Sequence, residues 1–122
     1  MKTLSLLGST GSIGMNVLAL VRQFPDRFRV AGLSAGRRID LLAEQVREFR
    51  PEVVSIADPA LADRLAALLP PDCRPEILTG AEGNRRVATL PAADMVVSAV
   101  VGAVGLLPVL AAIAEDFRET KP

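Results

Sequence analysis

The chain has 122 residues, of which 50% are hydrophobic, and its 14 lysines and arginines balance its 14 aspartates and glutamates. This length suits one domain with a sizeable core, and the even charge, without a basic run, argues against nucleic-acid binding. The chain has no histidine and one cysteine, Cys73, which excludes a histidine base, a histidine metal ligand and an internal disulfide.

Along the chain, short apolar runs alternate with apolar residues at helical spacing. In chain order this pattern predicts a strand at 4–7, a helix at 12–23, a strand at 28–33, a helix at 39–49, a strand at 53–57, a helix at 59–69, a strand at 76–78, a helix at 80–90, a strand at 95–101 and a helix at 106–117. Five such units without a hairpin signal predict an α/β fold: a single domain with a Rossmann-like, doubly wound parallel sheet.

Local signals refine three of these elements. Asp58 before Pro59 is typical of a helix cap followed by proline at the first helical position. Thr79 and Glu82 have the spacing of a capping box at the start of the fourth helix. The continuous β-branched run 95–101 predicts a central strand that is buried on both faces.

The apolar stretch 95–114 is interrupted by Gly102, Gly105 and Pro108, and therefore indicates a strand and a helix rather than a membrane span. We place its strand beside the first strand, because ligands bind where the strand order reverses, and we place the weaker strand 76–78 at an edge. No targeting segment precedes the first strand, so we expect a cytoplasmic protein.

Residues 8–14 read Gly-Ser-Thr-Gly-Ser-Ile-Gly and join the first predicted strand to the first helix. In such a loop Gly8 makes the tight turn, Gly11 lets the backbone approach phosphates, and Gly14 lets the helix pack close to the sheet. The N–H groups of 11–14 then face an anion from the positive end of the helix dipole. A glycine triplet alone also marks plain turns, but the strand before it and the helix after it favour a dinucleotide pyrophosphate site.

The end of the second strand indicates which dinucleotide the chain binds. An NAD site usually carries a carboxylate there, whereas this chain has Arg37 and Arg38 and no carboxylate before Asp40. A guanidinium suits the 2′-phosphate of NADPH. The alternative is that both arginines are merely solvated; we favour the phosphate because cations at a helix N-terminus are mildly unfavourable.

Longer segments also carry a resemblance. They are residues 8–14, 24–36, 42–51, 98–108 with 111–113, and the shorter 78–83. In this order they resemble the N-terminal, NADPH-binding region of the 1-deoxy-D-xylulose 5-phosphate reductoisomerase family.

The resemblance implies roles for individual residues. Those that would line the pyrophosphate are Thr10, Gly11, Ser12 and Ile13, and those that would receive the adenosine 2′-phosphate are Gly36, Arg37 and Arg38. The family usually has Gly-Lys-Asn at the second site, so Arg37 keeps the charge and Arg38 replaces a neutral amide.

The resemblance also implies an activity for the full-length enzyme. The family isomerises and reduces 1-deoxy-D-xylulose 5-phosphate, a phosphosugar, to 2-C-methyl-D-erythritol 4-phosphate in non-mevalonate isoprenoid biosynthesis. It uses NADPH and Mg²⁺ or Mn²⁺, and it is a homodimer.

The chain departs from the family after 111–113, where the family continues into a strand ending Leu-Ala-Asn-Lys-Glu and this chain reads Glu-Asp-Phe-Arg-Glu-Thr-Lys-Pro over 115–122. We therefore expect 1–122 to be a truncated NADPH-binding Rossmann domain that lacks the catalytic and C-terminal domains and binds cofactor without turnover. No catalytic or metal-binding residue is assigned. The alternatives are a non-catalytic dinucleotide-binding module and another NADPH-dependent reductase domain, such as a semialdehyde dehydrogenase.

Overall fold

The computed structural model describes residues 1–98. The five strands are β1 (Lys2–Leu7), β2 (Phe28–Ala35), β3 (Val53–Ile56), β4 (Glu76–Thr79) and β5 (Met95–Ser98). The helices are α1 (Ser12–Gln23), α2 (Ile39–Phe49), α3 (Ala62–Leu68) and α4 (Gly80–Ala88), with a 3₁₀ turn, η1 (Pro59–Leu61), before α3. The predicted alternation is confirmed throughout this part of the chain, whereas the predicted helix 106–117 and the loop 102–105 lie outside the described residues.

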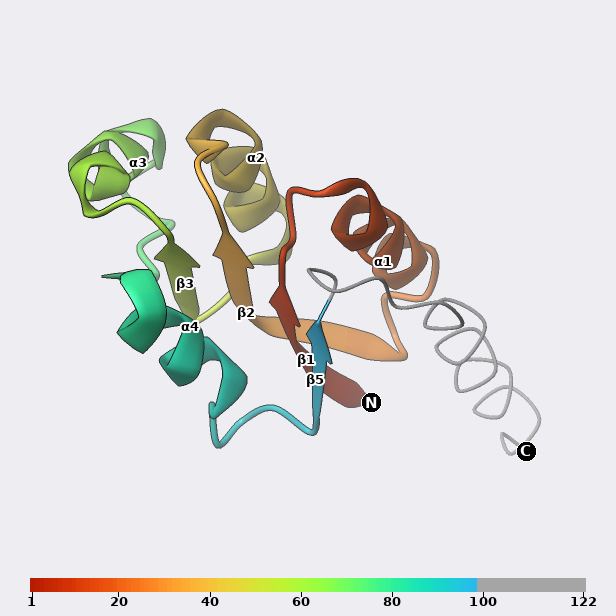
Figure 1. The fold of residues 1–122 in the computed structure, drawn as a ribbon. Helices are drawn as coiled ribbons and strands as arrows, with labels where there is room; N and C mark the ends of the chain where they lie inside the picture. Colours follow the sequence, from red (N-terminus) through yellow and green to blue (C-terminus); the bar gives the residue numbers. More distant parts are fainter. Residues whose placement is uncertain (99–122) are drawn as a thin grey trace, which may run out of the picture.

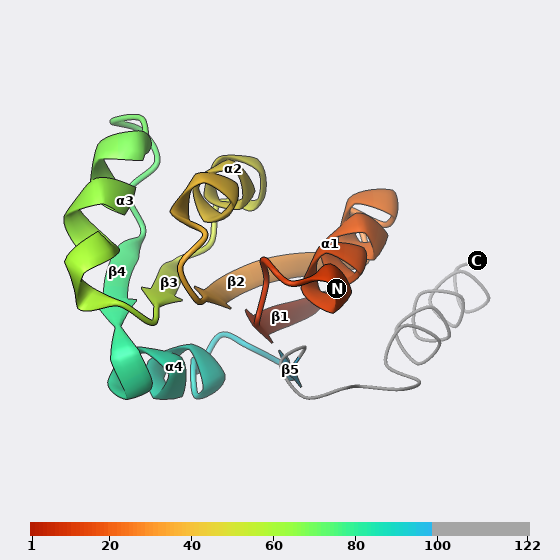
Figure 2. The ribbon, with the colours of Figure 1, turned by 45° about the horizontal axis from the view of Figure 1, so that its top comes forward.

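The sheet is entirely parallel and has the order β4-β3-β2-β1-β5. Helices α1, α2 and α3 cover one face of it, and α4 covers the other (Figures 1 and 2). The predicted doubly wound sheet is therefore confirmed, with β5 beside β1 and β4 at an edge. The strand order reverses between β1 and β5, which is where open α/β sheets bind their ligands.

Two apolar clusters hold the layers together. The larger lies between the sheet and α1–α3, and includes Leu4, Leu6 and Leu42. The smaller lies under α4 and includes Val53 and Val87. Successive residues of a strand point to opposite faces, so the strands contribute side chains to both clusters.

Capping residues were predicted at two helix starts, and one of these two predictions is confirmed. Asp58 does act as a cap, because its Oδ1 accepts a hydrogen bond of 3.0 Å from the N–H of Ala60, but it caps η1 before α3 begins. The predicted capping box at α4 is wrong: Thr79 is the N-cap residue but its side chain makes no capping hydrogen bond. The Glu82 carboxylate instead pairs with Arg85 at 2.8 Å, one turn along the helix.

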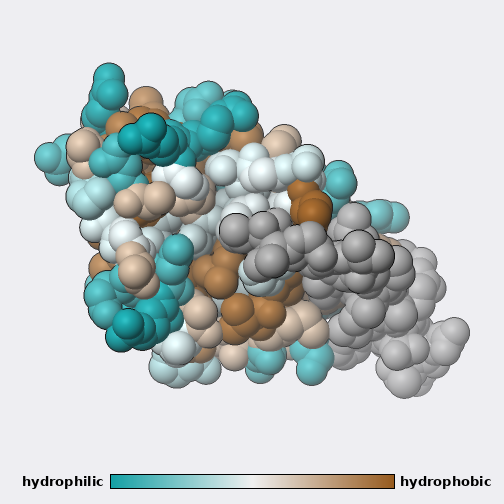
Figure 3. Space-filling view, in the orientation of Figure 1, coloured by the Kyte–Doolittle hydropathy of each residue, from teal (hydrophilic) through white to brown (hydrophobic). Residues whose placement is uncertain are grey.

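The prediction of a central strand that is buried on both faces is also wrong for residues 95–98, because β5 is the last strand on its side of the described sheet. Val97 is 2% exposed and faces the larger cluster, whereas Val96 is 46% exposed. Figure 3 shows hydrophobic surface beside α4 on this side of the molecule. A β-branched run identifies a strand, but it does not determine whether other elements cover both of its faces.

No helix within residues 1–98 is long and apolar enough to cross a membrane.

Candidate dinucleotide site

The loop after β1 turns sharply and is fixed to the neighbouring strand. Gly8 has a φ of 81°, the left-handed conformation that glycine adopts without strain. The N–H groups of Gly8 and Ser9 both donate to the carbonyl oxygen of Ser34 in β2, at 2.8 and 2.9 Å. The predicted tight turn at Gly8 is therefore confirmed, and the loop lies against the end of β2.

Gly14 is required by the contact between α1 and this loop. A Cβ atom at this position would lie 2.1 Å from the carbonyl oxygen of Gly8 and 2.8 Å from the Cα of Ser9. Both are backbone atoms, which cannot move aside cheaply. The predicted need for a glycine at position 14 is confirmed, but the atoms that it approaches belong to the loop and not to the sheet. A Cβ at Gly11 would lie 3.7 Å from the nearest chain atom, an ordinary contact, so the role of Gly11 toward phosphates stays a prediction.

The N-terminus of α1 fits an anion. Gly11 is its N-cap residue, no side chain caps it, and its first turn has no acidic residue. The first N–H groups of an α-helix have no partner within the helix, and the helix dipole places partial positive charge there. An uncapped helix start on a glycine loop is the arrangement that binds dinucleotide phosphates.

Gln45 holds the glycine loop from α2, and it is not among the residues predicted from the sequence. Its side chain lies in α2, is 6% exposed, and donates through Nε2 to the carbonyl oxygen of Ser9 at 2.9 Å. The available signal was a polar residue on the buried stripe of α2, next to Val46 and three residues after Leu42. A buried amide needs a hydrogen-bond partner, and here the partner is the glycine loop.

A second polar contact that the sequence did not predict joins the end of β2 to α4. The Ser34 hydroxyl donates to the Oδ1 atom of Asn84 in α4. Ser34 thus fixes the glycine loop through its carbonyl oxygen and α4 through its side chain.

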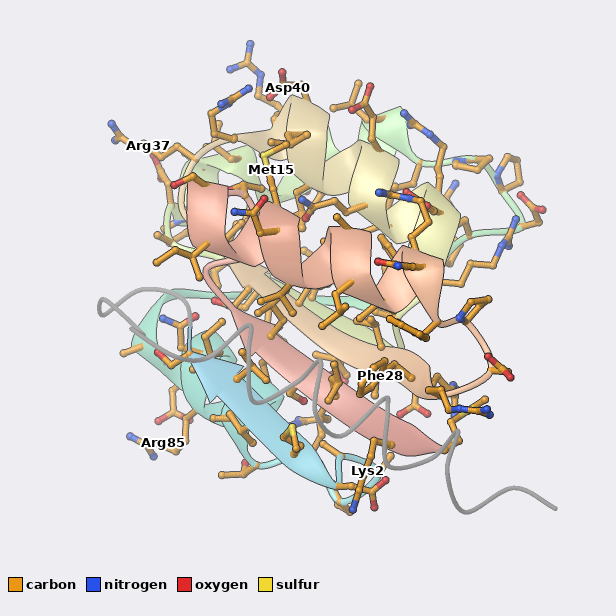
Figure 4. The ribbon with its side chains drawn as sticks, turned by 90° about the vertical axis from the view of Figure 1, so that its right-hand side faces the viewer. Lys2, Met15, Phe28, Arg37, Asp40 and Arg85 are labelled. Carbon is orange, nitrogen blue, oxygen red and sulfur yellow. The ribbon has the colours of Figure 1, made fainter. Side chains whose placement is uncertain are left out.

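The two arginines lie at the end of β2 and each has a carboxylate neighbour. Arg37 Nη2 is 3.3 Å from Asp58 Oδ2, and Arg38 Nε is 3.9 Å from Asp40 Oδ1. Figure 4 shows Arg37 projecting from the molecule at the end of the sheet opposite Lys2. These acids partly neutralise the arginines near the start of α2, so the unfavourable helix dipole is a weaker reason for assigning the arginines to a phosphate.

The structure brings both groups of predicted residues to the edge of the sheet where the carboxyl ends of the strands lie. Residues 10–13 form the loop and the first turn of α1, and residues 36–38 follow β2. The bonds from the loop to Ser34 hold the two groups together. A Cβ at Gly36 would meet no atom within 4 Å, so this position is open to a ligand.

The described residues were also compared with the needs of the metal ion that the resemblance implies. Within residues 1–98, no group of three or more cysteine, aspartate or glutamate side chains could hold a metal ion. The described donor set therefore does not fit the Mg²⁺ or Mn²⁺ that the resemblance implies.

The parallel sheet, the reversal beside β1 and the uncapped glycine loop define a Rossmann-type α/β domain with a loop of the dinucleotide-binding kind. The family model described as 1-deoxy-D-xylulose 5-phosphate reductoisomerase matches residues 4–118. The chain therefore belongs to the 1-deoxy-D-xylulose 5-phosphate reductoisomerase family, and the alternative of a semialdehyde dehydrogenase is wrong.

Individual relatives carry the same name. The reductoisomerase of Chlorobaculum tepidum is 52% identical over 113 residues, which are 93% of this chain and 29% of the relative. That of Synechococcus sp. strain CC9311 is 54% identical over 121 residues, with the same coverage of 93% and 29%. The chain thus spans less than a third of the length of these relatives.

Solved structures agree with this assignment. A DOX-P reductoisomerase in complex with NADPH, fosmidomycin and magnesium superposes with a TM-score of 0.77 at 38% identity, covering 92% of this chain and 28% of the other. The reductoisomerase from Zymomonas mobilis in complex with NADPH gives a TM-score of 0.69 at 33% identity, covering 75% and 24%.

Proposed function

We propose that this chain is the NADPH-binding part of a 1-deoxy-D-xylulose 5-phosphate reductoisomerase, and that residues 1–122 form its Rossmann domain. The observation that carries the proposal is the uncapped start of α1, which packs through Gly14 onto the glycine loop at the point where the strand order reverses. Solved relatives with the same fold are complexes with NADPH.

Each predicted residue has a proposed task. Thr10, Gly11, Ser12 and Ile13 surround the pyrophosphate, chiefly through backbone N–H groups. Gly36 leaves room for the adenosine ribose, while Arg37 and Arg38 bind its 2′-phosphate through charge-assisted hydrogen bonds. NADPH supplies the hydride when it is bound, and these residues hold its adenosine and pyrophosphate portions.

The activity of the whole enzyme is part of the proposal. It is the isomerisation and reduction of 1-deoxy-D-xylulose 5-phosphate to 2-C-methyl-D-erythritol 4-phosphate, carried out by a homodimer in the cytoplasm. The substrate is a phosphosugar, and nucleic acid and membrane have no part in the reaction. Because the described residues do not fit a metal ion, we assign the Mg²⁺ or Mn²⁺ to ligands outside residues 1–98.

Binding and turnover of this chain can be tested separately. We expect saturable binding of NADPH, read by nicotinamide fluorescence, which is little disturbed because the chain has no tryptophan or tyrosine. We expect no oxidation of NADPH when 1-deoxy-D-xylulose 5-phosphate and Mn²⁺ are added. Turnover would contradict the assignment of the catalytic parts to residues outside this chain. Failure of a folded chain to bind NADPH would contradict the binding proposal.

A further inference from the structure

Arg37, the residue that we assign to the cofactor 2′-phosphate, already has an anionic neighbour. Asp58 follows β3, the strand next to β2, and its Oδ2 lies 3.3 Å from Arg37 Nη2. We propose that Asp58 is a specificity-determining residue, which competes with the 2′-phosphate for Arg37 and so limits the preference for NADPH over NADH. This inference rests on the proposed function, because it concerns the same site.

Asp58 is the fixed member of the pair. Its Oδ1 accepts the N–H of Ala60 at 3.0 Å, which holds the carboxylate as the cap of η1. The preceding residue, Ala57, donates its N–H to the carbonyl oxygens of Ala35 and Gly36, both at 3.1 Å. The loop after β3 is therefore bound to the end of β2, and the Asp58 carboxylate is held beside the Gly36–Arg37 turn.

Arg37 is the adjustable member. Its side chain is 79% exposed, against 30% for Asp58, and exposed ion pairs contribute little free energy. A 2′-phosphate at the end of β2 can therefore draw the guanidinium away from Asp58, while the capping bond keeps the carboxylate in place.

The retained carboxylate affects the two cofactors differently. It repels the doubly charged 2′-phosphate of NADPH, and like charges close together raise the free energy of binding. NADH carries a hydroxyl at that position, which a carboxylate tolerates or accepts as a hydrogen-bond donor. Asp58 therefore weakens NADPH binding and leaves NADH binding unchanged or slightly strengthened.

The substitution Asp58→Asn isolates the charge, because asparagine caps helices about as well as aspartate. We expect the dissociation constant for NADPH to fall by about fivefold at low salt, and the constant for NADH to stay the same or rise. The matched control is Asp72→Asn. Asp72 pairs with Arg50 at 3.4 Å, also at the surface, but both residues precede strands and so lie at the opposite edge of the sheet. This control should change neither constant.

The outcomes are distinct. If Asp58→Asn weakens NADPH binding, Asp58 presents Arg37 to the phosphate, and the proposal is overturned. An unchanged ratio of the two constants, or an equal shift in the Asp72→Asn control, overturns it as well. If the unaltered chain is folded but binds neither cofactor, this result contradicts the proposed function itself, and with it the role of Asp58. If Asp58→Asn lowers the melting temperature, Asp58→Ser is measured in its place, because serine keeps a capping oxygen without the charge. The ratio of its dissociation constants for NADPH and NADH then tests the proposal in the same way.

Discussion

At the scale of single residues, position 14 has the clearest structural requirement for glycine. Alanine there would place Cβ 2.1 Å from the carbonyl oxygen of Gly8, so α1 or the loop must shift. We expect Gly14→Ala to reduce the free energy of unfolding by about 1–3 kcal/mol and to weaken NADPH and NADH binding alike. Chemical denaturation with a two-state fit measures the first effect.

Gly36→Ala is the matched control for stability, since a Cβ there meets no atom within 4 Å. Its free energy of unfolding should stay within about 0.5 kcal/mol of that of the unaltered chain. Equal losses of stability in the two variants would show that the close approach at Gly14 does not exist in solution.

The arginine pair gives a second prediction at the residue scale. Replacing Arg37 and Arg38 by alanine should weaken NADPH binding by roughly 10- to 150-fold, because a charge-assisted hydrogen bond is worth about 1.5–3 kcal/mol. NADH has no 2′-phosphate, so its affinity should change little. Paired fluorescence titrations check this, and an equal loss for both cofactors would mean that the arginines do not bind the 2′-phosphate.

Residue patterns predicted the glycine loop and the arginines but not the groups that hold them. Gln45, Asn84 and Asp58 are distant in sequence from the residues they contact: 36 positions separate Gln45 from Ser9, and 21 separate Asp58 from Arg37. Only the pairing of parallel strands brings these side chains to one edge. A buried glutamine on an apolar helix face was a usable signal, whereas an aspartate already explained as a helix cap was not.

At the scale of elements, an ion pair on the surface connects α1 with α2. Arg22 in α1 donates to both carboxylate oxygens of Glu48 in α2, at 2.5 and 2.7 Å. Its guanidinium also lies 5.6 Å from the centre of the Phe49 ring. The hydrogen bond from Arg22 holds the pKa of Glu48 below its ordinary value of 4.5.

This pair predicts a pH dependence of stability. Because the folded state lowers the pKa of Glu48, its contribution is complete above the unfolded pKa and is lost as the pH falls through the folded one. We expect Glu48→Gln to reduce the free energy of unfolding at pH 7 by no more than about 1 kcal/mol, since both side chains are exposed. Urea denaturation of both proteins at several pH values tests this. The difference should shrink as the pH falls below 4.5, and a difference that grows on acidification would contradict the assignment.

Periodicity predicted the elements well because each helix packs one face against a core and the strands contribute side chains to both cores. It failed where side chains had a choice of partners. The spacing of Thr79 and Glu82 permitted a capping box, but Arg85 lies one turn beyond Glu82 and takes its carboxylate. In β5 the alternation of buried Val97 and exposed Val96 was hidden, because both residues are valine.

At the scale of the whole molecule, the site depends on topology. The crossover through α4 returns the chain to the far side of β1, and the resulting reversal leaves the start of α1 open at the sheet edge. This strand order was predicted because a ligand was expected to bind where the order reverses. The strand propensities of the residues did not enter that prediction.

Whether this site binds NADPH through its 2′-phosphate is decided by the ratio of the dissociation constants of the unaltered chain for NADH and NADPH. The two constants come from parallel fluorescence titrations at one ionic strength. We predict saturable binding of both, with NADPH bound at least about tenfold more tightly, as one charge-assisted hydrogen bond to the 2′-phosphate requires. Equal affinities, or tighter binding of NADH by a folded chain, would contradict the assignment of the β2 edge to the 2′-phosphate.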